Sequence, residues 1–491
     1  MLATQKCQIP AETVARLKSN FSQNSTVRIP TSDAVGSTSR SPIEEQGNSR
    51  PATTIKPSLA SCLHSFEAGE SRVCLGSLRP QSGTTLAAQL QDLHAQLDTF
   101  LAEHGFKPGD IVKENIFLSQ RSAKAASRRF IKAYHVGQMP TTSFIIQPPA
   151  NGAHIAMEVL AIKGDKVQVE RVSENLTVVR DSNCRWAYVG GVEPAKGITD
   201  TYAQALSCFT RMHHHLQKAG FHFNQVVRTW IYVRDIVACD QDDLSNEHKQ
   251  RYQILNDARR QFFTTGNEGR PFTFPYNLPP ASTGIGMTEG NYVMECLALD
   301  MPQTAIEINP LNNPEQIDAH AYSQEVLERG AAAIKAAPLF SRGMSIRMDY
   351  KMLLISGTAS IKGQETICLD DPEGQTRTTL ENIDLVLGQA QATLRDVQQM
   401  RVYIKNSSRA AELSQRIEVI RRVVLATMPN IPILFVVADV CRDNLLVEIE
   451  ALSFLKARVG KTKTGQSATK SALKRVVSSR TTGRRTMPRR K

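Results

Sequence analysis

The pattern of hydrophobic and polar positions is clearest over residues 226–235, VVRTWIYVRD. β-Branched and aromatic residues dominate this stretch, and its period of two predicts a β-strand whose two faces differ. One face carries the large and charged side chains, namely Arg228, Trp230, Tyr232 and Arg234. The opposite face is expected to carry Val227, Thr229, Ile231 and Val233.

A variant of this strand pattern occurs twice more, over residues 111–120 and 397–406. In the three stretches an aromatic residue holds the same register, as Phe117, Tyr232 and Tyr403. Each stretch follows a short glycine-bearing strand and an amphipathic helical pattern, and each precedes a second helix and two closing strands. The sequence therefore predicts one β-β-α-β-α-β-β unit written three times.

The expected elements can be given unit by unit. The first unit has strands at 72–75, 111–120, 142–147 and 154–162, with helices at 84–106 and 123–134. The second has strands at 186–191, 226–235, 280–286 and 292–299, helices at 200–220 and 252–263, and a polar insertion at about 236–249. The third has strands at 353–357 and 397–406, helices at 378–394 and 410–427, and a closing hairpin of 433–440 with 446–452. A helix over 318–337 has no counterpart in the first unit and is expected to be a linker.

The domain boundaries follow from these units and from the composition of the ends. We expect a disordered leader over 1–56, units over 57–165, 166–302 and 303–455, and a basic disordered tail over 456–491. The leader is rich in Ser, Thr, Pro and Asn and has little apolar periodicity, which is typical of a disordered segment. The linker helix belongs to the third of these units.

Composition narrows the class of protein. Hydrophobic residues make up 41% and charged residues 22% of the chain, the balance of a soluble globular protein. No apolar run approaches the ~20 residues of a membrane span, and the N-terminus lacks the apolar core of a signal peptide. The nine cysteines are scattered and never form a C-x-x-C pair, which favours reduced thiols over disulfides or a zinc site. We therefore expect a cytoplasmic protein without a metal or cofactor.

The net charge of +12 belongs to the C-terminal tail. Residues 456–491 contain thirteen Lys and Arg residues and no acidic residue, which leaves the rest of the chain at about −1. Basic residues without interleaved aromatics attract phosphate without sequence preference. Contact with nucleic acid is therefore expected only through the tail, and a solubilising extension is an equal interpretation of it.

Four segments together resemble the RidA/YjgF family, also labelled L-PSP endoribonuclease: SGTAS (356–360), TLENIDLVLGQA (379–390), VYIKN (402–406) and ADVCRDNLLVEIEAL (438–452). Members of that family are usually trimers of one small domain, with ligand pockets between subunits. The resemblance implies an α+β fold of three tandem RidA/chorismate-mutase-like domains that form an intramolecular pseudo-trimer. We expect such a chain to be a monomer, with its pockets where the units meet.

The residues that the family uses for imine deamination are only partly matched. The family's glutamate on the last strand corresponds to Glu450, whereas Glu158 and Glu295 align with Glu448. The arginine that holds the substrate carboxylate is matched in none of the units, where Thr142, Ser282 and about 432–433 stand instead. A carboxylate clamp needs a guanidinium, so ordinary deamination is not expected.

The second unit resembles the chorismatase-like branch of the same fold through PASTGIG (280–286) and NDARRQFF (256–263). Those enzymes hydrolyse the enolpyruvyl ether of chorismate and release pyruvate, which requires cations for the carboxylates and an acid for the methylene carbon. The resemblance nominates Glu295 as the catalytic acid. The substrate-binding candidates are Arg228, Tyr232, Arg234, Arg259, Ser282, Thr283 and Gly284.

Two functional hypotheses remain open. The first is a hydrolytic enzyme, a hydrolase/deaminase or chorismatase-like lyase, that acts on a small enamine, imine or enol-ether carboxylate at an inter-domain cleft. The alternative is a non-catalytic metabolite-binding or scaffold protein that has lost the deaminase arginine. Several candidate residues also have a purely structural interpretation. Arg228 and Arg234 can be solvated or ion-paired, Glu295 can pair with an arginine at an interface, and Tyr232 can pack in a core or an interface. Cys441 and Arg442 are expected to be exposed near a hairpin tip.

Overall fold

Each predicted central strand forms and lies inside a sheet of its own. The computed structural model describes residues 61–242, 247–274, 278–300, 306–323 and 337–456. The leader 1–56 and all but the first residue of the tail 456–491 lie outside these residues. The central strands are β3 (Ile111–Leu118), β9 (Val226–Arg234) and β19 (Val397–Lys405).

The strands form three large sheets. The first sheet has the order β1 (Cys62–Ala68), β2 (Ser71–Leu78), β5 (Ile155–Lys163), β3 and β4 (Thr141–Ile145). The second has β12 (Ala281–Met287), β9, β13 (Tyr292–Asp300), β8 (Arg185–Val192), β7 (Leu176–Arg180) and β6 (Gln168–Ser173). The third has β14 (Glu307–Leu311), β15 (Gly343–Arg347), β16 (Tyr350–Ala359), β21 (Val447–Lys456), β19 and β20 (Ile433–Ala438). The mixed α+β fold is therefore confirmed, and β6 and β14 extend two sheets beyond the predicted order.

The two closing strands of each unit do not pair with each other, so the predicted hairpin of 433–440 with 446–452 is wrong. β20 pairs in parallel with β19, and β21 pairs antiparallel with the other edge of β19. The same arrangement holds for β4 and β5 around β3, and for β12 and β13 around β9. A helix follows each central strand and carries the chain back for a parallel pairing, which leaves the central strand between the two.

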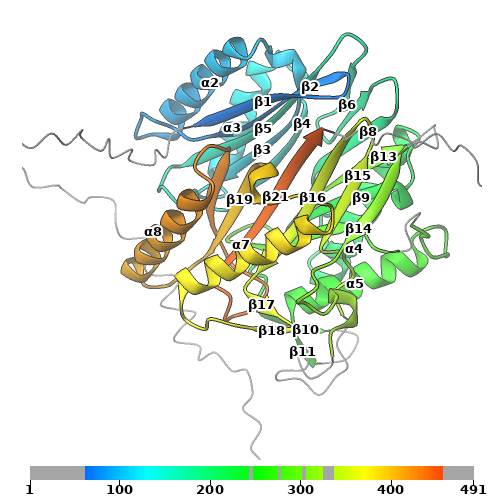
Figure 1. Cartoon of the computed structure of the whole chain (residues 1–491), viewed down its shortest axis with the longest axis vertical. Helices are drawn as coiled ribbons and strands as arrows, with labels where there is room; N and C mark the ends of the chain where they lie inside the picture. The colour runs from blue at the N-terminus through cyan, green and yellow to red at the C-terminus, as the bar shows by residue number, and fades with distance from the viewer. Residues whose placement is uncertain (1–60, 243–246, 275–277, 301–305, 324–336, 457–491) are drawn as a thin grey trace, which may run out of the picture. The chain divides into compact units, whose positions relative to one another are not determined.

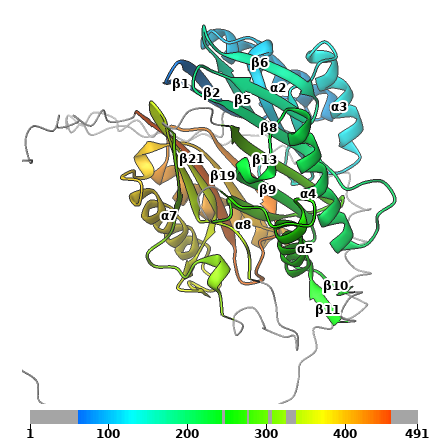
Figure 2. The same ribbon diagram turned by 90° about the vertical axis from the view of Figure 1, so that its right-hand side faces the viewer.

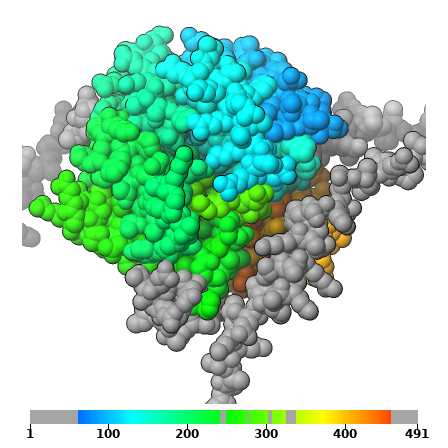
Figure 3. Space-filling model, turned by 180° about the vertical axis from the view of Figure 1, so that it is seen from behind, coloured from blue at the N-terminus to red at the C-terminus, as the bar shows by residue number. Residues whose placement is uncertain are grey.

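Two helices cover one face of each sheet. They are α2 (Leu86–Glu103) and α3 (Ala123–Tyr134), α4 (Thr201–Lys218) and α5 (Arg251–Thr265), and α7 (Pro372–Gly388) and α8 (Ala410–Thr427). In Figure 1 the yellow and orange helices α7 and α8 lie in front of the third sheet, and Figure 2 shows the helices outside and the strands facing inward. Seen from behind, the first unit (blue to cyan) and the second (green) meet along a shared boundary (Figure 3).

Local capping explains where several helices begin. The side chains of Thr85 and Asp200 accept backbone hydrogen bonds at the starts of α2 and α4. α7 begins before the predicted residue 378, because Asp371 caps it and Pro372 suits the first turn. The polar insertion contains a small hairpin of β10 (Cys239–Asp242) and β11 (Glu247–Gln250). Most of the predicted linker helix lies outside the described residues, and its described start holds only a short 3-10 turn, Ala319–Ala321.

The predicted alternation of the central strand fails at its first residues. Val227 packs in an apolar cluster between sheets, whereas Ile231 and Val233 pack under α4 and α5. The cause is a β-bulge, because Leu297 pairs with Arg228 and the next residue, Ala298, pairs with Val226. β3 and β19 carry a bulge at the same place, over residues 111–113 and 397–399.

The inward faces of the sheets form a shared core. Phe117, Tyr232 and Tyr403, which hold one register in the sequence, are fully buried together in one cluster. Backbone hydrogen bonds also cross between sheets, as from Gly286 to Asp439 (2.8 Å). The described residues contain no helix that is long and apolar enough to cross a membrane.

We expect Phe209→Ala to lower the free energy of unfolding by about 3–5 kcal/mol, because the ring is fully buried and stacks on Phe262 at 5.3 Å. Urea denaturation measures this change. Leu369→Ala is the control, because Leu369 is 59% exposed and its truncation should change stability by less than about 0.5 kcal/mol. Equal effects of the two substitutions would contradict the placement of Phe209 in the core.

Candidate functional site

Three buried glutamates occupy the same position in the three sheets. Glu158, Glu295 and Glu450 pair with Asn115, Trp230 and Arg401, which stand two residues before the register aromatics Phe117, Tyr232 and Tyr403. Glu158 and Glu295 therefore correspond to Glu450, and the sequence alignment of both with Glu448 is wrong. In sequence, the segments MEVLA, MECLA and VEIEA align best when Glu158, Glu295 and Glu448 share one position. Strand pairing instead places Glu158 and Glu295 at the position of Glu450, two residues later.

Each of these glutamates contacts a central strand of another sheet. Glu450 accepts from Arg228 (Nη2···Oε2 3.0 Å), from Thr283 (2.6 Å) and from Trp230 (Nε1···Oε1 3.0 Å), all in the second sheet. Glu295 pairs with Lys113 of the first sheet at 2.6 Å. Glu158 pairs with Arg401 of the third sheet (Nε···Oε2 3.0 Å).

A ring of charged residues connects the sheets and is almost inaccessible to solvent: Glu158, Glu295, Glu450, Lys113, Arg228 and Arg401. The pKa values of two of its glutamates shift in opposite directions. Burial opposes ionisation of Glu450, but Arg401 and Arg228 outweigh it and lower the pKa of Glu450 below its usual value. Burial raises the pKa of Glu158, against the opposing charge of Arg401. The hydroxyl of Tyr232 accepts from Arg401 at 2.7 Å. Because each glutamate of the ring is paired with a cation of another sheet, the ring is a structural connection between the sheets.

A second group of residues lines a cavity of about 310 Å³ between the second and third sheets, which we call the seam pocket. From the second unit it is lined by Tyr252, Gln253, Arg259, Ser282 and Gly284. From the third it is lined by residues that include Tyr322, Arg342, Gly357, Cys441, Arg442, Asp443 and Glu448. Its volume is that of a small-molecule site.

Glu448 is the carboxyl group best placed for acid chemistry in the seam pocket. In the described part of the chain no residue forms a hydrogen bond or ion pair with it, and it is 5% exposed. Burial and the nearby charge of Glu450 raise its pKa to about 8, against the opposing charges of Arg228 and Arg342. A Cβ on Gly357 would lie 2.0 Å from Oε1 of Glu448, so a larger residue at position 357 would displace this carboxyl group from its present position.

The seam pocket also contains guanidinium groups with free donors. Arg259 donates to the Leu339 carbonyl (3.2 Å), and Arg342 donates to the Ile317 carbonyl (3.0 Å) and the Tyr322 hydroxyl (2.6 Å). The Nε atoms of Arg259 and Arg342 are buried and have no hydrogen-bond partner among the residues that the structure describes. Buried donors without partners are rare, so both are suited to an anionic ligand.

The structure separates the residues that the sequence nominated. Arg259, Ser282 and Gly284 line the seam pocket together. Arg228 is a member of the ring, where it pairs with Glu450. Thr283 hydrogen-bonds to Glu450, and Tyr232 hydrogen-bonds to Arg401. Glu295 is held by Lys113. Arg234 lies at the end of β9, 44% exposed at its side chain, and pairs with Asp235 at 3.1 Å.

Sequence reasoning missed most of the third unit's contribution. Cys441 and Arg442 line the seam pocket and are half-buried, so the prediction that they are exposed is wrong. Glu448 was visible in the motif VEIEA but was not distinguished from the other strand glutamates. No local pattern marks Arg342, because its role depends on the seam that it faces.

Comparisons with known proteins agree with this architecture. Residues 330–454 match the family model described as Endoribonuclease L-PSP. A 3-hydroxybenzoate synthase from Streptomyces hygroscopicus is 27% identical over 267 residues, which cover 52% of this chain and 70% of that protein. A chorismatase from the same organism is 27% identical over 288 residues, covering 55% and 74%. These matches confirm the resemblance to the RidA/YjgF (L-PSP endoribonuclease-like) superfamily and to its chorismatase-like branch.

A solved structure shows the same fold. The crystal structure of a chorismatase matches with a TM-score of 0.52 at 18% sequence identity. The match covers 77% of this chain and 98% of that chain. Because it covers nearly all of that protein, the arrangement of sheets is shared and not confined to one unit.

Removing the cation between two ring glutamates should destabilise the fold. We expect Arg401→Met to lower the free energy of unfolding by about 3–5 kcal/mol, because Glu158 loses its buried partner. Adding Glu158→Gln should recover part of the loss, as measured by urea denaturation. Arg377→Met, in an exposed helical pair with Glu373, is the control and should have no measurable effect.

The buried carboxyl of Glu448 should also make stability depend on pH. Its pKa is about 8 in the folded chain and 4.5 without the fold, so the folded state binds more protons between these values. The contribution of the neutral carboxyl to the free energy of unfolding is fully present below about pH 4.5 and is lost as the pH rises through 8. We therefore expect Glu448→Gln to become more stable than wild type by an increasing margin from pH 5 to pH 8, on the order of a few kcal/mol. Parallel thermal-denaturation curves for the two proteins over this range would contradict the raised pKa.

Proposed function

We propose that the chain is a chorismatase-like hydrolase that acts on a small enol-ether carboxylate in the seam pocket. The observation that carries this proposal is Glu448, a carboxyl that pairs with none of the described residues and has a pKa of about 8, in a pocket lined by Arg259, Arg342 and Arg442. A carboxyl group that is neutral at pH 7 can donate a proton, which an ionised glutamate cannot.

We further propose that the three sheets are diverged copies of one module, over 57–165, 166–302 and 303–455, closed as a pseudo-trimer within a monomeric chain. Four common features support this: the strand order around the central strand, the bulge at its start, the register aromatic and the ring glutamate. At the position of Glu448 the other copies have Ala156 and Val293, which pair with Phe117 and Tyr232 as Glu448 pairs with Tyr403. Only one seam therefore carries the acid.

The proposed reaction begins with proton transfer from Glu448 to the terminal methylene carbon of the enol ether. The C=C bond supplies the electron pair, and the positive charge is shared by the adjacent carbon and the ether oxygen. Water adds to that carbon, and the resulting hemiketal loses the alcohol to leave a 2-keto acid, with a proton returned to Glu448. For an enolpyruvyl ether the keto acid is pyruvate.

The arginines account for the class of ligand. The free Nε donors of Arg259 and Arg342 come from different units and suit two anionic groups on one ligand. They replace the family arginine that Thr142, Ser282 and 432–433 do not supply. The relatives named chorismatase and 3-hydroxybenzoate synthase support a dicarboxylate of the chorismate type.

Incubation of the purified full chain with chorismate tests the proposal, with pyruvate as the readout. We expect turnover in the wild type, and a loss of about 10²–10⁴-fold in kcat for Glu448→Gln, because the amide cannot donate a comparable proton. The wild-type rate should fall as the pH rises through about 8, where Glu448 loses its proton.

Glu381→Gln is the matched control, since Glu381 is exposed on α7. Its kcat should equal that of the wild type. Turnover that survives Glu448→Gln would overturn the assignment of the acid. Saturable binding of chorismate without pyruvate release would instead support the metabolite-binding alternative.

A further inference from the structure

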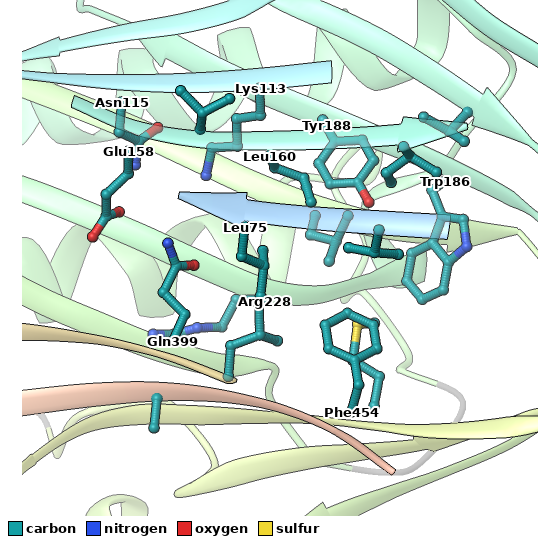
Figure 4. Close-up of a pocket in the computed structure, with 18 of the residues that line it drawn as sticks. Leu75, Lys113, Asn115, Glu158, Leu160, Trp186, Tyr188, Arg228, Gln399 and Phe454 are labelled. Atoms are coloured by element: carbon teal, nitrogen blue, oxygen red, sulfur yellow. The ribbon is translucent and has the colours of Figure 1, made fainter. Parts of the chain in front are cut away.

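A second cavity, of about 120 Å³, lies where the three sheets meet, and we call it the inner cavity. Strands of all three sheets line it, including β2, β5, β8, β9, β16, β19 and β21. Figure 4 shows the rings of Trp186, Tyr188 and Phe454 gathered at one end and Glu158 at the other. It is distinct from the seam pocket, because no residue lines both.

The walls of the inner cavity are mainly aromatic and aliphatic. Besides the three rings, they include Leu75, Val159, Leu160, Trp230, Tyr350, Met352 and Leu452. Such walls favour an apolar ring, which loses contact with water and gains dispersion contacts. An apolar cavity of ~150 Å³ in another protein binds benzene, so a cavity of this size suits one six-membered ring.

The charges around the inner cavity balance. Lys113, Arg228 and Arg401 face Asp181, Glu158 and Glu450, and the arginines and Lys113 are ion-paired within the ring. An anion would therefore find no uncompensated cation here. The seam pocket differs, because three arginines face Asp443 and a neutral Glu448.

Glu158, which lines the inner cavity, has a carboxylate oxygen that no described residue contacts by a hydrogen bond. Glu158 uses only Oε2 to accept from Arg401, and its Oε1 is buried without a hydrogen bond. The residue is 7% exposed, so bulk water does not readily satisfy this oxygen. A hydroxyl donor on an apolar ring would complete its hydrogen bonding.

We propose that the inner cavity is a binding site for a small neutral aromatic alcohol, with the ring against the aromatic walls and the hydroxyl donating to Oε1 of Glu158. The site is independent of the proposed reaction, because it uses neither Glu448 nor the arginines of the seam pocket. It draws on residues of all three units, so it exists only in the assembled fold.

The two tryptophans of the chain, Trp186 and Trp230, both line the inner cavity, so their fluorescence reports its occupancy directly. The experiment titrates the full chain with phenol and, separately, with benzoate, which has the same ring and a negative charge. We expect a saturable change of emission with phenol, and binding of benzoate at least about tenfold weaker because the cavity supplies no free cation. A phenol titration without saturation would overturn the proposal.

Leu160→Phe tests the location, because the added ring fills the cavity and should weaken phenol binding at least about tenfold. Leu369→Phe makes the same change at an exposed leucine and should leave binding unchanged. If Leu160→Phe does not fold, Leu452→Phe repeats the test from the third sheet. Glu448→Gln should keep phenol binding whether or not it loses turnover. Unchanged binding in a folded cavity-filling variant would place phenol elsewhere and overturn the proposal.

Discussion

Ion pairs that cross between sheets are the interaction on which the rest of this structure depends. Glu158, Glu295 and Glu450 each find their cation on the central strand of another sheet. A buried carboxylate without its partner costs several kcal/mol, whereas the complete pair adds little net stability over apolar packing. A sheet that shifts in register or separates leaves the charges of the ring without partners, so the ring penalises such arrangements.

Two glutamates of β21 differ in their pKa because they differ in their partners. Glu450 and Glu448 are two residues apart on one face of β21. Arg401 and Arg228 lower the pKa of Glu450, while burial and the charge of Glu450 raise the pKa of Glu448 to about 8. One carboxyl is thus held ionised as a connection between sheets, and its neighbour is kept neutral in a pocket. The open backbone of Gly357 makes room for the second.

Much of the fold was predictable because it depends on patterns of neighbouring residues. The central strands, α3 and α8 follow from hydrophobic periodicity, and the register aromatics identified the three strands that share one core. The candidate site was predictable only for Arg259, Ser282 and Gly284, which sit in motifs of the second unit. Strand pairing was not predictable. Neither the bulge at 226–228 nor the correspondence of Glu158 and Glu295 to Glu450 changes the hydrophobic pattern of the sequence.

The sequence by itself determined the type and order of the elements, their apolar faces and the likeness to a family, since each depends on neighbouring residues. Only the tertiary structure decided which surfaces meet. It brought Arg259 from α5 and Arg342 from the third unit into one pocket, and it removed Glu295 from that pocket by pairing it with Lys113. The physical reason is that periodicity reports which side of an element is buried, whereas an ion pair depends on what is buried against it.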